Sequence, residues 1–134
     1  MQITANNLTK FYGDKLVLDI DKLYFEEGKI TGITGLNGSG KSTLLNIISG
    51  LDSEYSGTVK YNDEVLNKYI MKKMTYVFQK PYLFRRTVLD NIQYPLKTRG
   101  VAQSKIDEIS DEILNRLEVS DLKHNKGHVL YWVV

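Results

Sequence analysis

The chain has 134 residues, of which 42% are hydrophobic and 25% are charged, and these fractions exclude an intrinsically disordered chain. A net charge of +2 is too small to indicate a nucleic-acid partner, and the absence of cysteine excludes disulfides and thiolate zinc sites. No stretch has the pattern of a signal peptide or the apolar length of a membrane span. We therefore expect one soluble globular unit in the cytoplasm.

Residues 3–25 have the pattern of two strands joined by a short turn. Gly13 and Asp14 supply turn chemistry, and apolar residues recur on both sides of them. The residues expected on the half-buried face are Val17, Leu18, Ile20, Leu23 and Phe25. This pattern predicts a small antiparallel sheet.

A glycine-rich loop follows, and Gly35–Thr43 satisfies every fixed position of the phosphate-binding P-loop pattern G-x-x-x-x-G-K-[ST]. Lys29–Thr34 predicts a strand entering the loop, and Leu44–Ile48 predicts a helix leaving it. Gly50 stands where the glycine that ends such a helix is expected. Strand, loop and helix therefore come in the order that directs a helix N-terminus at a bound anion.

Each residue type in this loop has a chemical reason to be there. Glycines let consecutive backbone N–H groups form a concave anion site, and Lys41 adds a positive charge beside it. The Ser42 hydroxyl is placed to ligate Mg²⁺. We expect nucleotide phosphates at the loop, bound by Gly35, Asn37, Gly38, Ser39, Gly40, Lys41, Ser42 and Thr43.

Three further elements are expected after the loop. Thr58–Tyr61 and Met74–Phe78 read as strands, the second of which ends at Gln79. A helix with a capping-box-like start is expected from Ser104. Its apolar stripe, which we expect to face the core or a partner, consists of Ile106, Ile109, Ile113, Leu114 and Leu117.

The motifs together resemble the first half of an ATP-binding-cassette (ABC) transporter ATPase, from Leu8 to about Leu122. The segment Leu8–Gly13 is similar to the aromatic A-loop of that family, and Gly35–Thr43 is its P-loop. Phe78–Phe84 with Thr87–Ile92 is similar to its Q-loop region. The resemblance implies a truncated α/β P-loop NTPase core with a small N-terminal antiparallel β-subdomain, and ATP and Mg²⁺ as cofactors.

The resemblance also assigns roles to two residues outside the P-loop. Tyr12 would lay its ring on adenine; it could instead be an ordinary strand tyrosine, and Phe11 is the alternative if the register differs by one residue. Gln79 would act in catalysis by ligating Mg²⁺ or orienting water, although a lone glutamine after a strand is usually only a loop residue. Ser42 and Gln79 are thus the expected metal ligands.

Partners and location follow from the same resemblance. Residues 81–100 would face a transmembrane subunit, with Tyr82, Phe84 and Leu89 as candidate contacts; packing within the chain is the alternative for each of them. A second ATPase subunit would bind head to tail. The chain would then lie on the inner face of the membrane, held there by its partners.

The resemblance stops after Leu122. The family continues with a Leu-Ser-Gly-Gly-Gln signature, an acidic strand and a switch histidine, and residues 123–134 contain none of these. We therefore divide the chain into 1–122, the N-terminal part of the ATPase domain, and 123–134, a divergent apolar tail from a frame shift, a truncation or an engineered fragment. His124 and His128 are expected at the surface. Val129–Val134 is expected to cover an open sheet edge or to aggregate.

These absences predict a chain that binds ATP without hydrolysing it. Two other functions stay open on the sequence. One is a different P-loop NTPase or kinase, although a GTPase would need an Asn-Lys-x-Asp segment that does not occur here. The other is an inert regulatory module that binds nucleotide and associates with a complete transporter.

Overall fold

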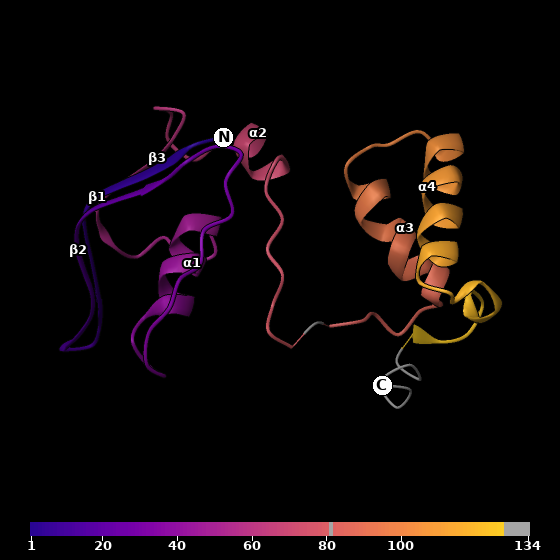
Figure 1. The fold of residues 1–134 in the computed structure, drawn as a ribbon, viewed down its shortest axis with the longest axis horizontal. Helices are drawn as coiled ribbons and strands as arrows, with labels where there is room; N and C mark the ends of the chain where they lie inside the picture. Colours follow the sequence, from indigo (N-terminus) through magenta and orange to yellow (C-terminus); the bar gives the residue numbers. More distant parts are fainter. Residues whose placement is uncertain (81, 128–134) are drawn as a thin grey trace. The chain divides into compact units, whose positions relative to one another are not determined.

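The computed structural model describes residues 1–80 and 82–127, which form two compact units divided between Tyr76 and Val77 (Figure 1). We describe each unit by itself. The division at Tyr76 replaces the single globular unit expected from composition. The boundary expected after Leu122 concerns where the sequence departs from its family, and it stays a prediction.

The first unit contains a three-stranded antiparallel sheet of β1 (Ile3–Tyr12), β2 (Lys15–Phe25) and β3 (Ser56–Tyr61) in the order β2-β1-β3. The turn between β1 and β2 contains Gly13, whose φ of 58° is a conformation that glycine adopts at little cost. The hairpin and the third strand were both predicted from the sequence, and the structure confirms them.

Helix α1 (Lys41–Ser49) packs on this sheet and completes the core of the first unit. It ends as predicted at Gly50, which has a left-handed φ of 76° and donates its N–H to Ile47 at 3.0 Å. The Tyr61 hydroxyl donates to the Ile48 carbonyl, and burial raises the pKa of Tyr61 to about 12. The buried apolar residues of this core are Ala5, Leu8, Leu18, Leu44, Ile47, Ile48, Val59, Tyr61 and Ile70.

Two expected strands are absent from the described residues. Neither Lys29–Thr34 nor Met74–Phe78 forms a sheet ladder, and the only described sheet is the antiparallel one. Ile30 is fully exposed and Val77 is 79% exposed, whereas Ile33 and Met74 are partly buried against the core. The physical reason is that a strand requires a paired neighbour, and no described segment lies in register with either of them.

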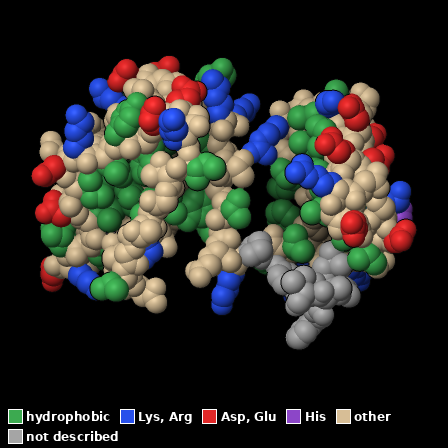
Figure 2. All heavy atoms as spheres, in the orientation of Figure 1, with side chains coloured by type: hydrophobic (Ala, Val, Ile, Leu, Met, Phe, Trp, Pro, Cys, Tyr) green, Lys and Arg blue, Asp and Glu red, His purple; other side chains and the backbone are tan. Residues whose placement is uncertain are grey.

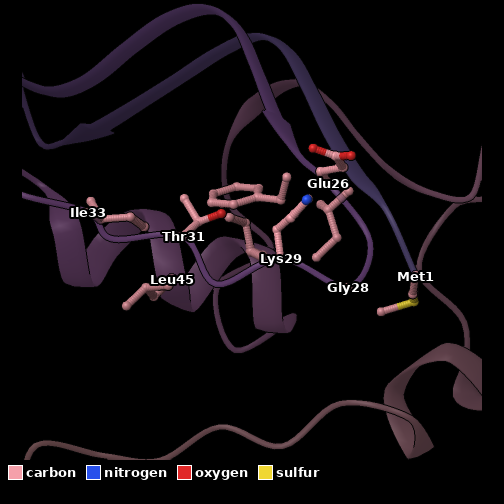
Figure 3. A pocket seen from close by; sticks show the side chains of 10 residues that line it. Met1, Glu26, Gly28, Lys29, Thr31, Ile33 and Leu45 are labelled. Atoms are coloured by element: carbon pink, nitrogen blue, oxygen red, sulfur yellow. The ribbon is translucent and has the colours of Figure 1, made fainter.

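The unpaired Lys29–Thr34 segment borders a hollow in the first unit (Figure 3). Ile33 from that segment and Leu45 from α1 contribute apolar walls, and Glu26 and Lys29 lie at its rim. Figure 2 shows hydrophobic side chains gathered on the viewed face of this unit. The hollow contains no residue of the Gly35–Thr43 loop, so the phosphate site must be sought elsewhere.

The second unit is built on α3 (Val88–Thr98) and α4 (Gln103–Arg116), followed by the short 3-10 helix η1 (Ser120–Leu122). Ile106 and Leu114 of the predicted stripe are buried, whereas Leu117 is exposed, so the stripe is mainly core. Neither α3 nor the short α2 (Lys68–Lys72) of the first unit was predicted from the sequence. No helix in the described part of the chain is long and apolar enough to cross a membrane.

The start of α3 is capped by two sets of contacts. Thr87 accepts from the Asp90 N–H at 3.0 Å, and its hydroxyl donates to the Asp90 carboxylate at 2.6 Å, which lowers the pKa of that carboxyl. The carbonyls of Asn125 and Lys123 accept from the first two amides of the helix, at 2.9 and 3.0 Å. Residues 123–127 therefore hold α3 in place.

The capping box expected at Ser104 is wrong, because α4 begins one residue earlier, after Ala102, without a side-chain cap. His124 is exposed as expected, whereas His128 and the segment Val129–Val134 lie outside the described residues. The Thr87 contacts show where a capping box does form in this chain.

We predict that Thr87→Ala destabilises α3 by about 1 kcal/mol, the usual cost of removing an N-cap side chain. The matched control is Ser104→Ala, which should leave α4 unchanged because that side chain caps nothing. Amide hydrogen exchange of both helices measures the two effects. Equal protection of α3 in the wild type and in Thr87→Ala would contradict the capping role.

Candidate functional site

The loop that leads into α1 has the backbone shape of an anion site. The Ser39 N–H donates to the Leu36 carbonyl at 3.2 Å, which closes a turn. Gly38 and Gly40 have left-handed φ values of 80° and 85°, so side chains are disfavoured at both positions. Such conformations let consecutive backbone amides face one concave side, and an anion site at this loop stays a prediction.

Gly40 is also the point where the loop touches the β1–β2 hairpin. A Cβ at this position would lie 2.6 Å from the Leu18 Cδ2 atom and 2.8 Å from the Val17 carbonyl oxygen. The register between β1 and β2 shifts here, since Lys10 pairs with Leu18 and Phe11 pairs with Leu16, which leaves Val17 as the extra residue of a bulge. The bulge thus brings the hairpin against the start of α1.

The Lys41 ammonium is held at the loop by backbone oxygens. Its Nζ donates to the carbonyls of Gly35 at 2.8 Å and Leu36 at 2.7 Å, and lies 3.5 Å from the Ser39 hydroxyl. These acceptors carry no formal charge, so the ammonium keeps an unneutralised positive charge at the loop. Such a charge is what a phosphate group requires.

The start of α1 adds further donors. The first hydrogen bond of the helix runs from the Leu44 N–H to the Gly40 carbonyl at 2.8 Å, and no side chain among the described residues caps this end. The amides of Lys41, Ser42 and Thr43 precede that bond and lie at the positive end of the helix dipole. Ser42 is exposed there, as is Asn37 in the loop. This donor set suits an anion, and a bound magnesium nucleotide with the Ser42 hydroxyl as metal ligand stays a prediction.

Tyr12 lies at the end of β1 with about half of its side chain exposed, and Phe11 is exposed to a similar degree. The Tyr12 hydroxyl donates to Asp52 at 3.3 Å, and Asp52 also accepts from the buried Lys10 ammonium at 2.8 Å. The Lys10 contact is the main cause of a lowered pKa at Asp52. Stacking of either ring on adenine stays a prediction.

Sequence reasoning missed Lys10 and Asp52. A signal for Lys10 was present, because it shares a strand face with Leu8, two residues earlier, and that face is buried. A lysine in such a register requires a partner of opposite charge. Nothing in the sequence identified Asp52 as that partner, since 42 residues separate the two.

Gln79 belongs to the second unit, where it is exposed and lies outside any helix or strand. The P-loop residues belong to the first unit, which is described separately. The expected roles of Gln79 in catalysis and metal binding therefore stay predictions.

The second unit carries a group of exposed aromatic side chains around the residues expected to meet a membrane partner. Tyr82 and Phe84 are in an edge-to-face contact at 5.9 Å between ring centres, and Phe84 lies 4.7 Å from Tyr94. Asn91 fixes the loop before α3 by accepting from the Phe84 N–H at 2.8 Å and donating to the Thr87 carbonyl at 2.9 Å. Leu89 is half-buried.

Comparison with known proteins gave consistent matches. The family model described as ABC transporter matches residues 18–130. The tungstate uptake system ATP-binding protein TupC of Peptoclostridium acidaminophilum is 47% identical over 97% of this chain and 60% of its own length. The sulfate/thiosulfate import ATP-binding protein CysA of Vibrio cholerae is 37% identical, over 92% of this chain and 34% of its own length.

The structure of cbiO1 from Clostridium perfringens, described as part of the ABC transporter complex cbiONQ, has a similar fold. Its TM-score is 0.76 at 24% identity, covering 94% of this chain and 54% of that protein. The chain therefore spans about 60% or less of the length of these three proteins.

We predict that Gly40→Ala destabilises the first unit by more than about 1 kcal/mol, because backbone strain adds to the contact with Val17 and Leu18. Gly38→Ala is the matched control, since its φ is also positive but a Cβ there meets nothing within 4 Å. Urea unfolding followed by circular dichroism compares the two. Equal losses of stability would mean that the approach of hairpin and loop contributes nothing.

Proposed function

The chain belongs to the ABC transporter family, as the motifs indicated, and we propose that it is the ATP-binding part of the ATPase subunit of an import system. The observation that carries the proposal is the Lys41 ammonium, held by neutral carbonyls beside the N-terminus of α1. This family assignment removes a small kinase or a GTPase from consideration.

In this proposal the P-loop binds the phosphates of Mg²⁺-ATP. The amides of residues 38–43 donate to phosphate oxygens, Lys41 neutralises their charge, and Ser42 ligates the metal ion. Tyr12 stacks on adenine, and Gln79 contacts the metal or the attacking water. The donor chemistry of the loop supports the phosphate contacts. The family motifs support the roles of Tyr12 and Gln79.

The proposed partners are a transmembrane subunit and a second ATPase subunit. Two features of the second unit support contact with an apolar helix of the first partner: the exposed aromatic residues Tyr82 and Phe84, and a hollow lined by Leu83, Ile92 and Val119. The relatives TupC and CysA are named for uptake and import, which supports transport into the cell. The chain would then act at the inner face of the membrane.

We further propose that a polypeptide of these 134 residues binds ATP without hydrolysing it. The sequence lacks the Leu-Ser-Gly-Gly-Gln signature, and no acidic strand end follows the Q-loop region to activate water. In the family each nucleotide lies between the P-loop of one subunit and the signature of the other. A pair formed with an intact subunit would therefore have two impaired sites.

The first test is nucleotide affinity. We predict that Lys41→Ala weakens ATP binding about 10-fold or more, because the phosphate loses a charge-assisted hydrogen bond. Lys60→Ala, which removes an exposed lysine of β3, is the matched control and should bind as the wild type does. Isothermal titration measures all three proteins. Equal affinity of Lys41→Ala and the wild type would refute the P-loop assignment.

The second test is phosphate release from Mg²⁺-ATP, with and without an intact subunit. We predict no turnover by the chain alone, and inhibition of the intact subunit, since loss of one electrostatic contact to the transition state commonly lowers a rate about 10²–10³-fold. Lys41→Ala controls for contaminating ATPases. Turnover of about 1 s⁻¹ or more that disappears in Lys41→Ala would show that residues 123–134 supply the missing chemistry.

A further inference from the structure

We infer that Lys10 and Asp52 are positioning residues that hold the Tyr12 ring ready for adenine. The inference rests on the proposed function, because it assumes that Tyr12 is the adenine contact. It adds two residues that neither touch the nucleotide nor belong to the P-loop. It also assigns a role to the Tyr12 hydroxyl, which plain stacking on the ring does not use.

Lys10 supplies one side of the arrangement. Its side chain is only 3% exposed, and its ammonium donates to the Asp52 carboxylate and to the Glu54 carbonyl. The same ammonium lies 4.9 Å from the centre of the Tyr12 ring, over its face. A buried cation that contacts a ring in this way restricts the orientations available to that ring.

Asp52 supplies the other side. One carboxylate oxygen accepts from Lys10 at 2.8 Å, and the other accepts from the Tyr12 hydroxyl at 3.3 Å. Asp52 is itself fixed, since its N–H donates to the Asn46 carbonyl near the end of α1, and its carboxylate accepts from the Glu54 N–H. The ring of Tyr12 is therefore attached through Asp52 to the helix that begins at the phosphate loop.

As a consequence, the Lys10 ammonium lies over one face of the Tyr12 ring, and Asp52 binds the Tyr12 hydroxyl. About half of the Tyr12 side chain remains exposed, which leaves ring surface for a planar base. Because the ring is already ordered, stacking loses less side-chain entropy than it would on a freely rotating tyrosine. A buried salt bridge that served only stability would not need the tyrosine hydroxyl, and this difference makes the inference testable.

The experiment measures the affinity of the whole chain for ATP and for inorganic tripolyphosphate, which lacks the base. We expect Tyr12→Phe and Asp52→Ala each to weaken ATP binding about 2- to 10-fold, the effect of one lost hydrogen bond. Tripolyphosphate binding should not change. The double variant should bind ATP no more weakly than the weaker single variant, since both substitutions break the same contact.

Two matched controls accompany these variants. Tyr24→Phe removes the hydroxyl of another half-exposed strand tyrosine, which bonds only to Gln2 among the described contacts. Glu54→Gln removes a carboxylate two residues from Asp52. Glu54 contacts Lys10 and Asp52 through its backbone atoms, and its side chain takes no part in these contacts. Both controls should bind ATP as the wild type does.

The outcomes separate the possibilities. Wild-type ATP affinity in Tyr12→Phe would overturn the inference, as would equal weakening of ATP and tripolyphosphate binding in Asp52→Ala, which indicates a structural role. If Asp52→Ala does not fold because Lys10 is left unpaired, Tyr12→Phe alone decides. Failure of the proposed function looks different, because the wild-type chain would then bind neither ligand, or would bind them no better than Lys41→Ala does.

Discussion

The close approach of the β1–β2 hairpin to Gly40 is the contact on which the arrangement of the site depends. The bulge at Val17 presents a carbonyl oxygen to a position where any side chain would clash. That contact fixes Gly40, the residue before α1, relative to the hairpin, and therefore the donors of the phosphate loop relative to Tyr12. Because Gly40 has no Cβ atom, the hairpin can approach the loop this closely. This approach sets the position of the phosphate loop relative to Tyr12, the two ends of the proposed nucleotide site.

The opposite end of α1 is fixed by a different kind of interaction. Gly50 ends the helix in a left-handed conformation, and Asp52 then binds Lys10 of β1. The helix is consequently attached to the sheet by van der Waals contact at one end and by a buried ion pair at the other. Removing either partner of such a pair leaves an uncompensated charge, which is costly in a partly buried position.

Local chemistry made part of this fold predictable. The turn at Gly13 and the end of α1 at Gly50 depend on residues close together in sequence, and both were predicted correctly. The strands predicted at Lys29–Thr34 and Met74–Phe78 were wrong, because a strand forms only when it pairs with a neighbour that can be distant in the sequence. Helix α3 was missed because Pro95 lies inside it and proline usually interrupts helices. The partner of Lys10, Asp52, could not be predicted for the same reason as the strands, because it is 42 residues away in the sequence.

The two sides of the phosphate loop are held in different ways, because the Lys29–Thr34 segment that enters the loop is not paired in a sheet. The exit side continues into a packed helix, whereas the entry side has no ladder hydrogen bond among the described residues. Fixing the backbone of one residue costs about 1–2 kcal/mol of conformational entropy. If a phosphate binds here as proposed, one side of its site is a packed helix, and the other side is a segment held without ladder hydrogen bonds, which leaves more of that entropy cost to binding. Any neighbour that paired with Lys29–Thr34 would raise nucleotide affinity without touching the nucleotide.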